Sequence, residues 1–147
     1  MATDAEKKQL ILQFIRRHTI GVIATSSFDG KPEAAVVEYG ETEKLELIID
    51  AFMSSRKCMN IQQNPRVAFV IGWDDNITVQ YEGIATELIG EELAQCKHVY
   101  FAKNARAARW ESRPGITYLK ITPTWIRYPI LNGIHGKFLK YHFREHR

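Results

Sequence analysis

The chain has few cysteines and no long apolar segment. Cys58 and Cys96 are its only cysteines among 147 residues, which is too few for a disulfide scaffold or a cysteine-rich zinc site. No stretch approaches the roughly 18 apolar residues of a membrane-spanning helix. The first eight residues, MATDAEKK, contain several charged side chains, whereas a secretory signal needs an apolar run there. We therefore expect a soluble, cytoplasmic protein with no membrane partner.

The chain also has little excess charge of either sign. Twenty basic and 17 acidic residues give a formal net charge of +3. Residues 136–147 contain four of the basic residues and one acidic residue, so the rest of the chain has 16 of each. A nucleic-acid-binding protein needs a contiguous basic surface, so we expect no nucleic-acid partner.

Several catalytic and metal-binding motifs are missing as well. The sequence has no G-x-G-x-x-G, P-loop or G-x-S-x-G pattern. Its five histidines show no H-E-x-x-H spacing, which argues against a metal site. No side chain is a compelling catalytic acid or base. A nucleophile at Cys58, near the start of a helix and beside Lys57, is an alternative because both neighbours could lower the pKa of the thiol.

What the sequence does contain is a series of short strands and three helices. Thr3 and Glu6 form a capping-box pattern, and Asn64-Pro65 ends the second helix. The predicted helices cover residues 4–18, 55–63 and 91–103, the last continuing to 110. Alternation and turn signals predict strands at residues 19–26, 33–39, 45–51, 66–73, 77–88 and 116–128, with a bulge or bend at Gly83 and an interruption at Pro123.

These elements predict a mostly β, α+β fold: a closed antiparallel barrel of six strands with flanking helices. The strand at residues 66–73 is apolar on both faces, so we expect it to be buried on both. Residues 1–130 form the predicted domain, and residues 131–147 form a basic C-terminal extension.

The segment Ser55-Arg56-Lys57 is the strongest candidate for a binding site. With Ser55 as N-cap, two cations occupy the positive end of a helix, where each costs about 0.3–1 kcal/mol when exposed. A bound phosphate would reverse the sign of that interaction, because free backbone N–H groups, a hydroxyl, a guanidinium and an ammonium would all face it. The alternative is that both long side chains bend into solvent.

Polar and small residues on three strands are further candidates. Thr78 and Gln80 share a strand face, and Gln80 suits the amide-like edge of a heterocycle. Residues 34–37 are small enough for a flat ring to approach the backbone. Trp125 and Arg127 share a face and could cover a ring or a phosphate. The alternatives are an ordinary surface, a core strand and a packing or dimer contact, respectively.

Taken in order, several motifs resemble the pyridoxamine 5′-phosphate oxidase-like family of flavin-binding split-barrel proteins. These are a G-x-P opening the second strand, then S-R-K, then N-P-R-V before an apolar strand, all within residues 30–73. V-Q-Y-E-G-I-A within residues 77–88 and I-T-P-T-W-I-R-Y at residues 121–128 continue the match, which covers about residues 7–130. The resemblance implies a split barrel and a homodimer with FMN in clefts between the subunits.

The resemblance also implies roles for individual residues. Ser55, Arg56 and Lys57 resemble the phosphate-binding segment. The other implied cofactor contacts are Ala35, Val36 and Val37 along the flavin ring, Asp50 where the third strand leads to the phosphate segment, Thr78 or Gln80 in place of the family's glutamine, and Trp125 and Arg127 from the second subunit.

The resemblance does not extend to the substrate. True pyridoxamine phosphate oxidases have basic residues where this chain has Ala35 and Gly40. Their substrate-binding Arg-x-His motif is matched here only by Arg144-Glu145-His146, in the basic extension. We therefore expect an FMN-dependent oxidoreductase that uses NAD(P)H or a small organic substrate. The alternatives are a deazaflavin or other phosphate-bearing ring as cofactor, or a non-enzymatic flavin-binding or stress-related ligand-sensing module.

Overall fold

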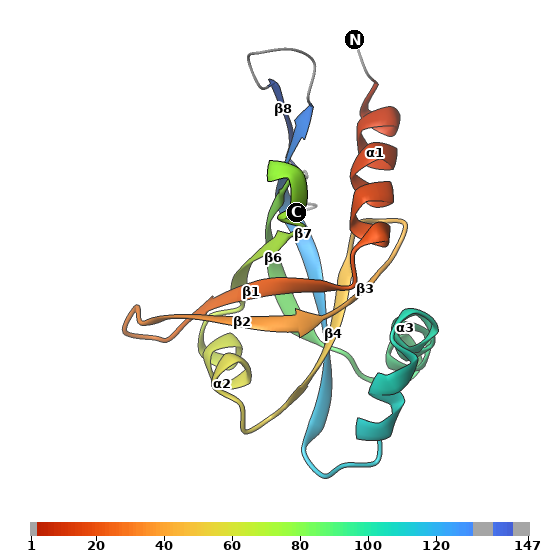
Figure 1. The fold of residues 1–147 in the computed structure, drawn as a ribbon. Coiled ribbons are helices and arrows are strands. Elements are labelled where there is room, and N and C mark those ends of the chain that lie inside the picture. The colour runs from red at the N-terminus through yellow and green to blue at the C-terminus, as the bar shows by residue number, and fades with distance from the viewer. Residues whose placement is uncertain (1–2, 131–136, 143–147) are drawn as a thin grey trace.

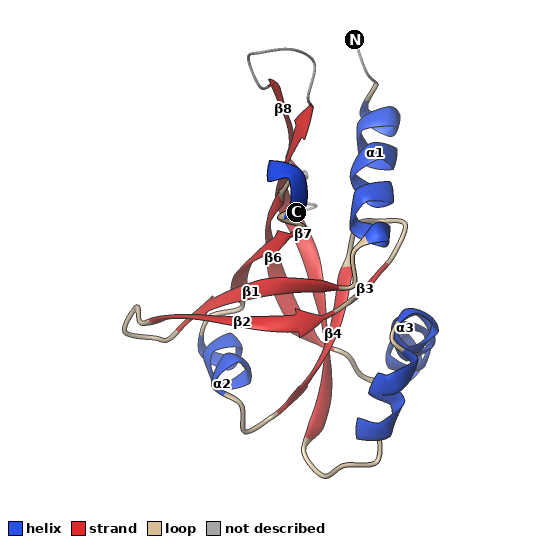
Figure 2. Cartoon of the chain, in the orientation of Figure 1, coloured by secondary structure: helices blue, strands red, loops and turns tan. Residues whose placement is uncertain are grey.

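The computed structural model of the protein describes residues 3–130 and 137–142. The helices are α1 (Asp4–Arg17), α2 (Arg56–Gln63) and α3 (Gly90–Lys103), with two short 3-10 helices, η1 (Asp74–Asn76) and η2 (Ala105–Trp110). The strands are β1 (Ile20–Ser26), β2 (Pro32–Glu38), β3 (Gly40–Glu41), β4 (Leu47–Phe52), β5 (Arg66–Ile71), β6 (Val79–Glu87), β7 (Ile116–Ile130) and β8 (Lys137–His142) (Figures 1 and 2).

All strands belong to one antiparallel sheet. Its order is β2-β1-β5-β6-β7-β4-β3, and β8 pairs with β7 beyond the end of β4. The sheet is strongly curled, so that β2, at one end of this order, contacts β4, near the other end, without pairing with it. Figure 1 shows β1 and β2 running across the molecule and β6 and β7 running along it. The sheet is therefore a barrel with an open seam between β2 and β4.

This architecture confirms the predicted α+β split barrel with flanking helices but corrects the number of strands. The described residues form eight strands rather than six. Gly40–Glu41, predicted as part of a turn, is the two-residue strand β3, which is too short to show any alternation. Lys137–His142 lies in the predicted basic extension and forms β8. The Arg144-Glu145-His146 motif lies outside the described residues.

Apolar side chains from the inner sheet face, α1 and α2 form the main core. Ile11, Phe14 and Ile15 of α1 and Cys58 and Ile61 of α2 pack against the strands. The predicted start of α1 is confirmed, because Thr3 and Glu6 exchange side-chain hydrogen bonds of 2.8 and 3.2 Å with each other's backbone N–H groups. No helix in the described part of the chain has the length and apolarity needed to cross a membrane.

A second cluster lies on the outer face of β4 and β7, where α3 and η2 cover the sheet. It contains Ile48 and Tyr118 from the strands and Cys96, Tyr100 and Ala107 from the helical segments. No such cover lies over β1, β2 and β5 in the described residues, so the outward side chain of Val70 is 36% exposed. The prediction that residues 66–73 are buried on both faces is therefore wrong: β5 is fully buried only toward the barrel.

The long pair formed by β6 and β7 contains one irregularity. Glu82 pairs with Trp125 and Gly83 with Pro123, which leaves Thr124 as an extra residue on β7. A Cβ on Gly83 would lie 2.6 Å from Ile121 Cγ2 and from the Thr122 carbonyl oxygen, so only glycine fits there. The predicted bulge is confirmed. The predicted interruption at Pro123 is wrong, since β7 continues through it and the bulge accommodates a residue without an N–H group.

Candidate ligand-binding cleft

The open seam of the barrel contains a cleft of about 220 Å³, which we call the seam cleft. One wall is the unpaired edge of β2, and the other is the end of β4 with the start of α2. The segment that connects α3 to β7 closes one side. The residues that line the seam cleft are Val36, Val37, Glu38, Asp50, Ala51, Phe52, Ser55, Lys57, Trp110 and Ile116.

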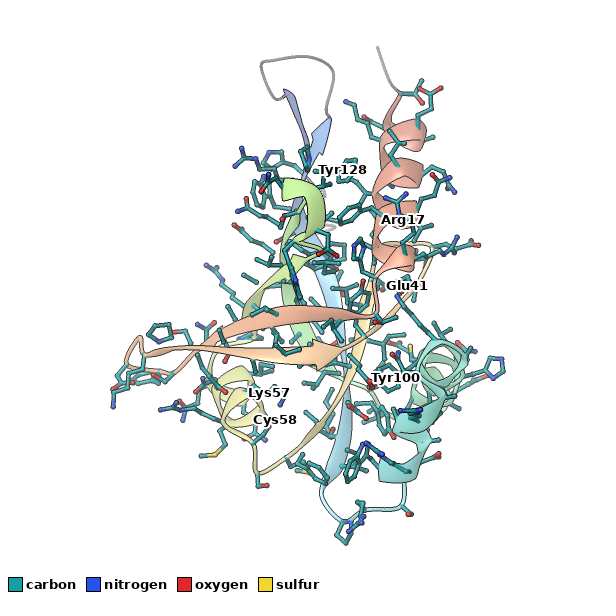
Figure 3. The ribbon with its side chains drawn as sticks, viewed as in Figure 1. Arg17, Glu41, Lys57, Cys58, Tyr100 and Tyr128 are labelled. Atoms are coloured by element: carbon teal, nitrogen blue, oxygen red, sulfur yellow. The ribbon has the colours of Figure 1, made fainter. Side chains whose placement is uncertain are left out.

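The start of α2 gives the seam cleft a positive end. Ser55 is the N-cap, as predicted, and its Oγ accepts a hydrogen bond from the backbone N–H of Cys58 at 3.4 Å. The first turn contains no acidic residue. The side chain of Lys57 is half-buried and lines the cleft, whereas Arg56 is exposed and is not among the lining residues. Figure 3 labels Lys57 at the start of this helix.

An acidic residue lies beside this positive end. Asp50 is half-buried in the cleft wall, and burial raises the pKa of its carboxyl group above the usual range. The nearby charge of Glu38 raises this pKa further. The Lys57 ammonium lowers it, and so does the Tyr100 hydroxyl, which lies close to the carboxyl group without meeting the geometry of a hydrogen bond. The cleft therefore combines a cation with a carboxyl group that binds a proton more readily than an exposed aspartate.

Three other predicted residues lie together in a different place. Thr78, Gln80 and Arg127 line a second hollow of about 150 Å³ with Asn76 and Pro129; we call it the β6–β7 hollow. Gln80 and Arg127 are direct cross-strand neighbours. Within a single chain, the predicted site is therefore divided between the seam cleft and the β6–β7 hollow.

The remaining predicted residues line neither depression. The Ala35 side chain packs against the barrel core, so only its backbone faces the open edge. Trp125 is half-buried opposite Glu82 and His142. Sequence reasoning did not identify Glu38, Phe52 or Trp110 as cleft residues. Trp110 carried no signal, because only the packing of η2 against the end of β4 brings its ring to 6.1 Å from that of Phe52.

A row of cross-strand neighbours connects the two depressions along the outer sheet face. Val36 pairs with Val22, Val22 with Val70, Val70 with Gln80, and Gln80 with Arg127. At about 4.8 Å per strand, Val36 and Gln80 are about 14 Å apart along the sheet. Val36 is 65% exposed, so the row presents an apolar surface between the two depressions. We call this the valine row.

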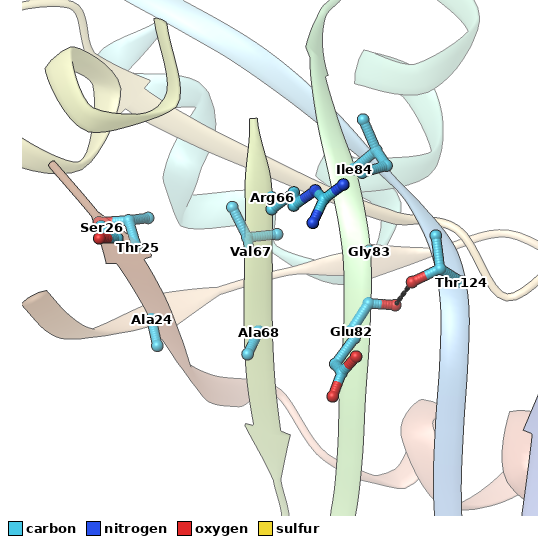
Figure 4. Close-up of a pocket in the computed structure, with 10 residues that line it drawn as sticks. All are labelled: Ala24, Thr25, Ser26, Arg66, Val67, Ala68, Glu82, Gly83, Ile84 and Thr124. Carbon is cyan, nitrogen blue, oxygen red and sulfur yellow. Dashed lines mark hydrogen bonds between the residues drawn. The ribbon is translucent and has the colours of Figure 1, made fainter. Parts of the chain in front are cut away.

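A hollow of about 550 Å³, larger than the seam cleft and the β6–β7 hollow, lies beside the valine row and contains none of the predicted site residues. Figure 4 shows it spreading over β1, β5, β6 and β7, where the small residues Ala24, Ala68 and Gly83 leave room. The Thr124 hydroxyl donates a 3.2 Å hydrogen bond to the Glu82 carbonyl oxygen at its edge. It is a broad depression of the sheet surface, with no cluster of convergent polar groups. The residues that the structure describes also contain no group of three or more potential metal ligands.

Comparisons with known proteins agree with this fold. The family model described as pyridoxamine 5′-phosphate oxidase matches residues 8–129. General stress protein 26 from Bacillus anthracis is 25% identical, with a TM-score of 0.70, and the match covers 92% of this chain and 98% of that one. No protein among the curated sequences compared matches the chain.

Two further structures are similar in fold. A heme binding protein from Mycobacterium smegmatis has a TM-score of 0.78 at 19% identity, covering 97% of this chain but 59% of the length of that protein. The heme storage protein HutZ from Vibrio cholerae has a TM-score of 0.64 at 12% identity, covering 78% of this chain and 88% of that one. At these identities the likeness concerns the fold alone.

Proposed function

The chain belongs to the pyridoxamine 5′-phosphate oxidase family, and from this premise we propose that it binds FMN in the seam cleft and acts as a flavin-dependent oxidoreductase. One observation carries the proposal: the cleft combines an open strand edge with the acid-free start of a helix. A flat ring can lie along the first, and a phosphate can bind at the second.

The phosphate would bind at the start of α2. The first N–H groups of a helix have no partner within the helix, and Ser55 satisfies only that of Cys58. The Lys57 ammonium adds a full positive charge at the same end of the cleft. No acidic side chain in the first turn competes for these donors. Arg56, which is exposed and does not line the cleft, would contribute through its longer-range positive charge.

The flavin ring would lie against the edge of β2. This strand ends the sheet, so the backbone of residues 35–37 offers unpaired N–H and C=O groups on its open side. The ring nitrogens and carbonyl oxygens of a flavin are suitable partners for such groups. Asp50 Oδ2 is buried and has no hydrogen-bond partner, which fits a ligand that supplies a donor at this point.

We further propose that a second copy of the chain completes the site. The valine row presents the exposed side chains of Val36 and Val70 on an uncovered sheet face, and it connects the seam cleft with the β6–β7 hollow. In a homodimer packed through this face, Gln80, Thr78, Trp125 and Arg127 of one copy would lie near the seam cleft of the other. This arrangement would reunite the two halves of the predicted site.

FMN, when bound, supplies the hydride or electron transfer, and the chain's own residues bind and orient it. Lys57 and the start of α2 hold the phosphate, and the β2 edge fixes the ring. The half-buried Trp110 shields one side of the cleft from water. We propose NAD(P)H or a small organic molecule as the reaction partner, because the rim of the cleft is open.

Two other functions have specific support. The likeness to a general stress protein, at 25% identity, supports a stress-related role, and we propose a flavin-binding module without turnover as a second candidate. The likeness to heme-binding folds suggests heme as the ligand. However, no histidine of the described residues lines the seam cleft or the β6–β7 hollow, so neither site provides the commonest heme ligand.

An absorption spectrum of the freshly purified protein, and of the protein titrated with FMN and with heme, tests these proposals. Flavin bands that bleach on adding NAD(P)H support the oxidoreductase. Flavin bands that are inert to reductants favour the non-enzymatic module, and a Soret band with no flavin binding favours heme. A protein that binds neither FMN nor a deazaflavin contradicts the proposed cofactor.

A further inference from the structure

Three polar oxygens without hydrogen-bond partners gather behind the seam cleft. They are Asp50 Oδ2 and the hydroxyls of Tyr100 and Tyr118. Asp50 and Tyr118 are direct cross-strand neighbours on β4 and β7, and Tyr100 of α3 lies beside both. The two tyrosine rings pack edge to face with their centroids 6.3 Å apart. Tyr100 is 0% exposed and Tyr118 is 4% exposed. Unpartnered buried oxygens are rare, so one carboxyl oxygen with two unpartnered hydroxyls beside it calls for an explanation.

The groups around Asp50 determine what this cluster can do. Glu38 faces it from β2, Lys57 from α2, Tyr100 from α3 and Tyr118 from β7. Burial raises the pKa of both tyrosines, that of Tyr118 to about 12, so both hydroxyls keep their protons at neutral pH. Beyond Tyr118, Glu111 is paired with Lys97 at 3.1 Å. Among the described residues, Lys57 is therefore the cation that lowers the pKa of the Asp50 carboxyl group.

A phosphate at the start of α2 would change this balance. Lys57 at present counters the negative charge of an ionised Asp50. If Lys57 instead pairs with a phosphate, the carboxylate loses that support and gains a neighbouring anion. Both changes favour the protonated carboxyl group. Protonated Asp50 can also donate a hydrogen bond to the ligand or to a tyrosine oxygen, which gives the cluster a proton that it can share.

We propose that Asp50 is a specificity-determining residue of the seam cleft that takes up a proton from solvent when a phosphate-bearing ligand binds. The cleft thereby binds the anion and a proton together, and affinity for the anion falls as Asp50 ionises. This inference rests on the proposed function for the location of the phosphate. It requires no covalent step and no co-reactant other than a solvent proton.

The test compares the Kd for FMN of the wild-type protein and of Asp50→Asn between pH 5.5 and 8.5. FMN phosphate titrates near this range, but its own titration cancels in the ratio of the two Kd values. We expect a ratio near one at low pH and about tenfold weaker binding by the wild type at high pH, since an adjacent like charge shifts a pKa by about one unit or more. A ratio that does not change with pH overturns the inference.

Glu38→Gln is the matched control, because Glu38 lines the same cleft but is exposed. The charge of Glu38 raises the pKa of Asp50, but solvent screens an exposed carboxylate, so the ratio for Glu38→Gln should change with pH much less than the ratio for Asp50→Asn. The same pH-dependent ratio in Glu38→Gln would assign the effect to the general charge of the cleft and overturn the role of Asp50. In weakly buffered solution, FMN binding should also consume protons with the wild type and fewer with Asp50→Asn.

A second probe separates the inference from the proposed cofactor. If neither protein binds FMN at any pH, the proposed function fails. Inorganic phosphate then serves as the probe, and the carboxyl ¹³C shift of Asp50 reports its protonation. Phosphate should move the titration midpoint of Asp50 to higher pH in the wild type, and this movement should disappear in Lys57→Ala. An unchanged midpoint overturns the inference.

Discussion

Lys57 and Asp50 line the same cleft, so an ammonium at the start of a helix and a half-buried carboxyl group at the end of a strand face one cavity, where the ammonium lowers the pKa of the carboxyl group. The short connection between β4 and α2 produces this arrangement. The start of α2, whose N–H groups and Lys57 can bind an anion, thus follows closely after Asp50, whose carboxylate repels one. Ligand affinity and its pH dependence should therefore respond to changes in this connection more than to changes elsewhere on the surface.

Lys57→Ala should weaken FMN binding about ten- to a hundredfold, because a charge-assisted hydrogen bond contributes roughly 1.5–3 kcal/mol. Arg56→Ala should have a smaller effect, since Arg56 is exposed and does not line the cleft. The double variant Arg56→Ala/Lys57→Ala should bind most weakly while keeping its fold, as judged by far-UV circular dichroism. Fluorescence titration gives the three affinities.

Lys44→Ala removes an exposed lysine from the turn before β4 and serves as the control for net charge. Its affinity for FMN should match that of the wild type. A loss of less than a few-fold in the double variant would show that the phosphate does not bind at the start of α2.

Val70→Glu should convert the proposed homodimer into monomers and release the cofactor. Val70 lies in the middle of the valine row and lines neither the seam cleft nor the β6–β7 hollow. A carboxylate buried there without a partner opposes association. Sedimentation velocity measures the mass, and flavin absorbance measures the cofactor that remains bound.

Ile89→Glu makes the same kind of change at a residue that is 74% exposed, just before α3, and should leave both measurements unchanged. Monomeric Val70→Glu that keeps FMN with full affinity would contradict the proposal that a second copy completes the site.

Asp50→Asn should stabilise the free protein at neutral and higher pH. The pKa of Asp50 is raised in the folded state, so between the unfolded and folded pKa values the folded chain binds more protons than the unfolded chain. The free energy of unfolding therefore falls as pH rises through the folded pKa. Asparagine removes this loss, so the gain in Tm over the wild type should be present at pH 8 and absent at pH 4. An equal gain at both pH values would show that ionisation of Asp50 is not the cause.

Local patterns predicted most of the fold because each leaves a clear mark in the sequence. The capping box at Thr3 begins α1, Asn64 ends α2, and Gly83 of β6 lies opposite the bulge in β7. The curvature of the sheet leaves no such mark. The curvature leaves the outer side of β5 without a covering element and brings β2 beside β4.

The same reason limits what the sequence predicted about the site. Ser55 and Lys57 were identified because a cation at the start of a helix is unfavourable without a ligand. Nothing near Trp110 or Tyr100 in the sequence indicates that either residue faces Asp50 or its cleft. Whether Gln80 contacts the cofactor depends on a second copy of the chain, and no local pattern encodes that geometry.

Tyr81→Phe should lower the free energy of unfolding by about 1–3 kcal/mol. The buried hydroxyl of Tyr81 lies 2.7 Å from the Leu45 carbonyl oxygen and 3.1 Å from that of Ile121, so it links β6 to β7 and to the turn before β4. Leu45 has a φ of 62°, a left-handed conformation that its neighbours must hold in place. Phenylalanine leaves the Leu45 carbonyl without this donor.

Tyr100→Phe is the matched comparison, because Tyr100 is equally buried but its hydroxyl has no partner. Removing an unpartnered hydroxyl takes away an unfavourable desolvation, so urea unfolding at pH 7 should show a much smaller loss of stability than for Tyr81→Phe, or a gain. Equal losses for the two variants would mean that the Tyr100 hydroxyl is as well bonded as that of Tyr81. The three unpartnered oxygens behind the seam cleft would then be satisfied within the chain, and the reason to expect a proton on Asp50 during ligand binding would disappear.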